Sequence, residues 1–182
     1  MKKFLTVMLF ALFGSWPALA QMPIGQNTNG TQVYGTTNVP LTAATTIAAT
    51  TFTTTGIALP SVPASTTVHG YCHIVWQQAT AAATVSFGAG FSNAPTDAYI
   101  FSSINTAASG TATKAYTTLT AAGPTIIGAA ATPGAAATNY EANFDFVLVT
   151  GTSPAAITLY GLTSNASDAL VIQPGSNCGY QN

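Results

Sequence analysis

The clearest pattern of apolar and polar positions lies in Val68–Trp76, where the two kinds of side chain alternate. In an extended strand, successive side chains point to opposite faces of the sheet. One face of this segment carries Cys72, Ile74 and Trp76, and the other carries His69, Tyr71, His73 and Val75. Because the first set is apolar and bulky, we predict a strand whose Ile74 and Trp76 side chains lie in the core.

A second alternating segment, Tyr140–Thr150, is the longest in the chain. Phe144, Phe146 and Leu148 share one of its faces, and the acidic and amide side chains share the other. Phenylalanine removes a large apolar area from water when it is buried. We therefore predict that these three residues belong to the core together with Ile74 and Trp76.

Shorter segments of the same kind recur between turns rich in glycine and proline. They are Thr84–Phe87, Asp97–Phe101, Lys114–Thr120, Thr125–Ile127, Ala156–Leu162, Ala169–Ile172 and Asn177–Tyr180. The Thr/Ala tract Leu41–Ala64 predicts one or two further strands, since threonine favours strands over helices; a Thr-rich glycosylated stalk is the alternative.

No segment sustains the apolar period of 3.6 residues that is typical of helices. Many short strands between turns indicate an all-β sandwich or a closed sheet. We predict an antiparallel β-sandwich of about 8–10 strands.

Residues 1–20 have the pattern of an export signal. Two lysines precede the apolar run Phe4–Phe13, and Ala18-Leu19-Ala20 is a small-x-small cleavage site. An uncleaved anchor is the alternative. We expect a cleaved signal helix, and hence a protein that passes through the periplasm and is secreted, either extracellular or at the cell surface, with no membrane span after cleavage.

The remaining chain divides into two parts by composition. Residues 21–40 are rich in Gly, Asn, Thr and Pro and have almost no apolar periodicity, which predicts a flexible N-terminal arm. Residues 41–182 contain all the predicted strands, so we expect them to form the β-sandwich domain.

Charged residues make up only 4% of the sequence, against about a quarter in an ordinary soluble domain. Arginine is absent, and Lys114 is the one basic side chain after residue 20. Polyanion binding depends on lysine and arginine, so nucleic acid is excluded as a partner. A nearly neutral surface also repels copies of itself only weakly, and we therefore expect a homo-oligomer.

The sequence contains two cysteines, Cys72 and Cys178. In an exported chain this number indicates an oxidising compartment and one disulfide, which would stabilise the fold by roughly 4 kcal/mol. Two buried free thiols are the alternative.

Three stretches together carry a resemblance to a known class of domains. They read GYCHIVWQQATAAATVSFGAG, NFDFVLVTGTSPAAITLYGLTSNAS and LVIQPGSNCGY. Their layout of short strands resembles the jelly-roll domains at the tips of phage tail fibres and, more loosely, the tumour necrosis factor-like jelly rolls. The resemblance implies a jelly-roll-like sandwich, a trimer and a surface used for attachment. Because phage fibres assemble inside the host cytoplasm, the export signal favours a secreted bacterial surface or matrix protein of the same architecture.

No pattern in the sequence predicts a catalytic, cofactor or metal site. His69 and His73 share a strand face about 13 Å apart, too far for one zinc ion with ligands at about 2 Å. Glu141 and Asp145 have the same spacing, which exceeds the separation of about 5–9.5 Å in glycosidase carboxyl pairs. Gly88-Ala89-Gly90 lacks the third glycine and the following helix of a dinucleotide-binding turn. We expect a protein that is not an enzyme.

Tyrosine gives the one functional signal. Tyr99, Tyr116, Tyr160 and Tyr180 have Asn and Gln nearby and form a candidate ligand surface, since sugars need aromatic faces and neutral hydrogen-bond partners. The alternative is that these tyrosines pack and hydrogen-bond locally.

The hypothesis that these observations favour is an exported structural or attachment protein that self-associates as a homotrimer or fibre. A carbohydrate-binding jelly-roll module with a cell-surface glycan as its partner is the second hypothesis. The third is a pilin-like subunit completed by a strand donated from Gln21–Thr37 of a neighbouring copy.

Overall fold

The computed structural model describes residues 36–106 and 112–181. The predicted signal helix and the first part of the predicted arm, residues 1–35, lie outside the described residues. The described part belongs to one compact unit, contains no helix and forms twelve strands. The strands are β1 (Thr36–Pro40), β2 (Thr45–Ile47), β3 (Thr53–Ala58), β4 (Thr67–Gln78), β5 (Val85–Phe91), β6 (Asp97–Asn105), β7 (Ala112–Leu119), β8 (Thr125–Ile126), β9 (Tyr140–Val149), β10 (Ile157–Thr163), β11 (Leu170–Ile172) and β12 (Asn177–Gln181).

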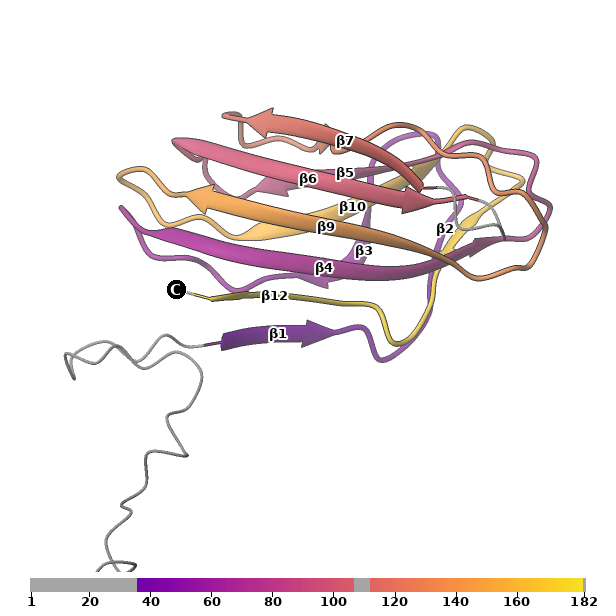
Figure 1. The fold of residues 1–182 in the computed structure, drawn as a ribbon, viewed down its shortest axis with the longest axis horizontal. Coiled ribbons are helices and arrows are strands. Elements are labelled where there is room, and N and C mark those ends of the chain that lie inside the picture. Colours follow the sequence, from indigo (N-terminus) through magenta and orange to yellow (C-terminus); the bar gives the residue numbers. More distant parts are fainter. Residues whose placement is uncertain (1–35, 107–111, 182) are drawn as a thin grey trace, which may run out of the picture. The chain divides into compact units, whose positions relative to one another are not determined.

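These strands form two antiparallel sheets packed face to face, which confirms the predicted β-sandwich. The larger sheet has the order β1-β12-β4-β9-β6-β7, and β2 joins it through β11, which also pairs with β4. The smaller sheet has the order β3-β10-β5-β8. In Figure 1 the larger sheet lies in front, and the fainter strands of the smaller sheet lie behind it.

The strand order is that of a jelly roll. The pairs are nested along the chain, because β1 and β2 pair with β12 and β11, β3 pairs with β10, β4 with β9 and β5 with β8. A long antiparallel hairpin with these pairs, rolled into two layers, gives this architecture. The hairpin β6–β7 is inserted between β5 and β8 and extends the larger sheet beyond β9. If β1 with β2 and β11 with β12 are each taken as one bent strand, ten strands remain, within the predicted range.

The folded unit begins earlier than the sequence indicated. Thr36–Pro40, the last part of the predicted arm, is strand β1 and pairs with Asn177–Gln181. The segment has little apolar character because it is an edge strand held by backbone hydrogen bonds, a place where Pro40 is tolerated. Thr36 and Thr37, which belong to the segment considered for strand donation, pair with residues of their own chain.

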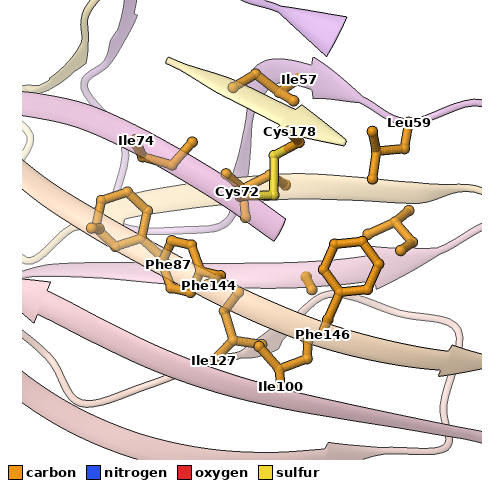
Figure 2. Packing of buried hydrophobic residues seen from close by; sticks show 14 of the residues in the cluster. Ile57, Leu59, Cys72, Ile74, Phe87, Ile100, Ile127, Phe144, Phe146 and Cys178 are labelled. Carbon is orange, nitrogen blue, oxygen red and sulfur yellow. A yellow bond between two sulfur atoms is a disulfide. The ribbon is translucent and has the colours of Figure 1, made fainter. Parts of the chain in front are cut away.

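The predicted core residues lie between the two sheets. Ile74, Trp76 and Leu148 have no exposed surface, and Phe144 and Phe146 are 1% and 7% exposed. Figure 2 shows Phe144 and Phe146 directed into this layer, with Phe87 of β5 beside Phe144. The ring centroids of Phe87 and Phe144 are 5.5 Å apart in an edge-to-face arrangement, so aromatic contacts join the two sheets.

The predicted disulfide joins Cys72 of β4 to Cys178 of β12. The two residues are directly opposite in the strand register, and both are buried (Figure 2). A disulfide is compatible with an extracellular protein. None of the described segments is a helix long and apolar enough to cross a bilayer.

A buried carboxylate, Asp168, holds the connection between β4 and β5. It accepts hydrogen bonds from the backbone N–H groups of Thr80, Ala82 and Ala83 at 2.8–3.0 Å. This connection includes Ala81 with a left-handed φ of 55°, a conformation that costs about 1–2 kcal/mol without glycine. Burial by itself raises the pKa of Asp168, but the backbone hydrogen bonds lower it more, so this pKa lies below its ordinary value.

We expect Asp168→Asn to lower the free energy of unfolding by about 2 kcal/mol at pH 7, because it weakens charge-assisted hydrogen bonds. A lowered folded pKa means that the carboxylate stabilises the fold fully above about pH 4 and loses this contribution as the pH falls through the folded pKa. The difference between the wild type and the variant should therefore shrink below pH 4. Denaturant unfolding at pH 7 and pH 3 measures it, with the exposed Glu141→Gln as the control; an equal difference at both pH values would contradict this account.

Candidate binding groove

Aromatic and polar side chains form a row across the outer face of the larger sheet. Tyr71 of β4 is opposite Asp145 of β9, Asp145 is opposite Phe101 of β6, and Phe101 is opposite Tyr116 of β7. These four strands lie side by side (Figure 1). Their inward neighbours fill the core, so strand alternation places this row on the outer face.

The neighbouring row, two residues along each strand, contributes three side chains, His69, Val147 and Tyr99, to the lining of a groove. This row contains His69, Val147, Tyr99 and Thr118 in successive register positions. The groove is open, has a volume of about 360 Å³, and is lined by His69, Gly70, Tyr99, Phe101, Tyr116, Asp145, Phe146 and Val147. Its size is at the lower end of the range for small-molecule sites.

The aromatic rings of the groove are unusually accessible. Tyr116 is 85% exposed and Tyr99 is 50% exposed. The ring of Phe101 lies against that of Tyr116, with centroids 4.8 Å apart and planes inclined by 46°. The two rings therefore form one tilted platform at the β6–β7 end of the groove.

The four tyrosines of the predicted ligand surface do not form one surface. Tyr99 and Tyr116 line the groove, but Tyr160 lies on β10 of the smaller sheet, where its ring packs edge-to-face on Phe52. Tyr180 is only 6% exposed, because it lies on the same inward face of β12 as Cys178. For these two residues the structure shows the alternative, local packing.

Sequence reasoning did not assign the groove residues His69, Phe101 and Asp145 to a binding site. Alternation alone places Phe101 on the same face as Tyr99, two residues earlier. The meeting of β6 with β9 and of β9 with β4 depends on register between segments far apart in the chain, which no local pattern encodes.

The two histidines of β4 have separate surroundings. His73 Nδ1 donates to Asn143 Oδ1 at 2.9 Å across the β4–β9 pair, and His69 lines the groove. Within residues 36–106 and 112–181, no three His, Cys, Asp or Glu side chains come together in an arrangement suited to a metal ion.

The strands of the smaller sheet contribute no charged side chain to its outer face, unlike the strands of the larger sheet. The side chains of Asp97, Lys114, Glu141 and Asp145 are on strands of the larger sheet, whereas β3, β5, β8 and β10 contain no charged residue. The half-buried side chains of Thr158, Tyr160 and Leu162 alternate along β10 on this face.

Two glycines of β5 allow aromatic rings to cover this sheet closely. A Cβ atom on Gly88 would lie 2.5 Å from the ring of Phe52, and one on Gly90 would lie 2.9 Å from the ring of Tyr160. Both distances are below van der Waals contact, so only glycine leaves room for the rings. The Gly-Ala-Gly sequence thus has a packing role.

The strand order and the groove define the class of protein as a jelly-roll β-sandwich with an aromatic groove on its larger sheet. No protein-family model matches the chain, and no curated protein matches it. Among solved structures, the chain is similar to one described as "Structure of infectious bursal disease virus Gx strain", with a TM-score of 0.22 and 12% identity, over 81% of this chain and 38% of that one. The chain thus spans less than half the length of that protein. The jelly-roll fold is assigned from the strand order alone.

Proposed function

We propose that this protein is an exported, non-enzymatic structural or attachment protein that self-associates, as a trimer or a fibre, through the outer face of its smaller sheet. The observation that carries the proposal is the segregation of charge, which leaves this face neutral. Two copies meeting through it would bury no unpaired charge, and burial of an unpaired charge is what most strongly opposes association.

The composition of the face also suits contact between copies. Phe52, Tyr160 and Leu162 offer apolar surface, and Thr158 is small and neutral. Tyrosine and phenylalanine are enriched in the buried centres of protein interfaces, and charged residues are depleted there. An attachment role for the assembled protein is what the resemblance to phage tail-fibre tips in the sequence pattern implies; the strand order itself supports only the jelly-roll fold.

The test is the mass of the purified exported chain in solution. We expect an oligomer whose population changes little with salt, since no ion pair is needed at the proposed interface. Thr158→Lys places a charge in the centre of the face and should raise the dissociation constant at least about tenfold. Sedimentation velocity and native mass spectrometry measure the change.

Thr118→Lys is the matched control, because it makes the same substitution on the outer face of the larger sheet. It should leave the oligomer intact. A wild-type chain that stays monomeric at high concentration would overturn the proposal, and so would dissociation by Thr118→Lys but not by Thr158→Lys.

A further inference from the structure

We infer that the groove on the larger sheet binds a neutral oligosaccharide. The inference concerns the face opposite to the proposed self-association surface and does not depend on self-association. It rests on the shape of the groove, the exposure of its aromatic rings and the kind of polar atom between them.

The groove exposes a large aromatic surface to solvent. Tyr116 at 85% and Tyr99 at 50% exposure contribute little to the packing of the fold. Large apolar surface left in water and gathered in one groove is typical of a binding site. The C–H groups on one face of a pyranose ring pack on aromatic rings of this kind, while tyrosine hydroxyls bind polar groups at the edge.

A carboxylate lies beside these aromatic rings. Asp145 lines the groove and lies directly opposite Phe101 of the Phe101–Tyr116 platform in the strand register. Its exposed carboxylate accepts hydrogen bonds from two vicinal hydroxyl groups in the strong, charge-assisted way. His69 lines the same groove and supplies a ring nitrogen. A ligand that presents both an apolar face and several hydroxyl donors matches this arrangement.

The charges of the groove residues limit the classes of ligand that can bind. Asp145 is the only carboxylate among the groove residues, and no lysine or arginine lines the groove. An anionic glycan or a phosphate would be repelled. Sites for quaternary ammonium ions are typically cages of aromatic rings, whereas the Phe101 and Tyr116 rings pack against each other with centroids 4.8 Å apart and do not face each other across a gap.

The groove is long enough for more than one sugar ring. The lining residues run from His69 on β4 to Tyr116 on β7 across four adjacent strands, a distance of about 14 Å at the usual spacing between strands. This is longer than one sugar ring, so the groove fits an extended oligosaccharide lying across the strands.

The experiment measures binding of the purified exported chain to three neutral hexasaccharides, maltohexaose, cellohexaose and N-acetylchitohexaose, by calorimetry. We expect at least one to bind. Tyr116→Ala should raise its dissociation constant about tenfold through lost stacking, and Asp145→Asn about tenfold or more through loss of a charged acceptor. Ile126→Ala removes an exposed apolar side chain from the smaller sheet and should leave binding unchanged.

Further measurements separate this inference from other readings. Thr158→Lys should bind the hexasaccharide as tightly as the wild type, because the two faces are independent. The inference is overturned if none of the three sugars binds, if Tyr116→Ala binds as well as Ile126→Ala, or if heparin or choline binds in the groove more tightly than every neutral hexasaccharide.

Discussion

Loss of the Cys72–Cys178 disulfide will lower the free energy of unfolding by about 4 kcal/mol. The two cysteines are 106 residues apart in sequence, so the bond closes a long loop and restricts the unfolded chain strongly. It also ties β12 to the central strand β4, and β1 pairs only with β12 in the described part of the chain. The double variant Cys72→Ala/Cys178→Ala should therefore melt about 10–15 °C below the wild type.

Denaturant unfolding monitored by circular dichroism gives the size of this effect. Reduced wild-type protein is the control, because it lacks the bond but retains both sulfur atoms and leaves no cavity. Similar losses in the reduced protein and in the double variant would assign the effect to the cross-link. A loss below about 1 kcal/mol in both would show that the cross-link contributes little, against the chain-entropy expectation.

Trp76→Ala should cost about 4 kcal/mol, since it leaves a large cavity between the sheets. Trp76 is fully buried, and its ring centroid lies 5.1 Å from that of Tyr140 and 6.1 Å from that of Phe87. It therefore contacts aromatic rings of both sheets. Since a domain of this kind is stable by only about 5–15 kcal/mol, this variant will be partly unfolded at moderate temperature.

Trp76→Phe is the matched variant and separates volume from hydrogen bonding. The indole Nε1 has no hydrogen-bond partner within the described residues, so phenylalanine removes a buried donor without breaking a bond. The cost should fall to about 1–2 kcal/mol. Chemical denaturation of the two variants tests this, and equal losses for alanine and phenylalanine would mean that the indole nitrogen is satisfied in solution.

Local periodicity gave the right side-chain faces in the two best strands. Alternation in Val68–Trp76 and Tyr140–Thr150 predicted which residues point inward, because the period of two is a property of each strand's own backbone. The same rule applied to β12 places Tyr180 on the face of Cys178, and this signal would have removed Tyr180 from the predicted ligand surface. The strand β1 escaped prediction because an edge strand needs backbone partners more than apolar side chains.

The sequence alone predicted an all-β sandwich poor in charged residues and left each cysteine only the other as a possible partner within the chain. Only the tertiary structure decided the jelly-roll strand order, the direct opposition of Cys72 and Cys178, and the register that aligns Asp145, Phe101 and Tyr116 on neighbouring strands. The physical reason is that register between distant strands is fixed by the packing of the whole sandwich, whereas the face of each residue is fixed by its nearest neighbours in the chain.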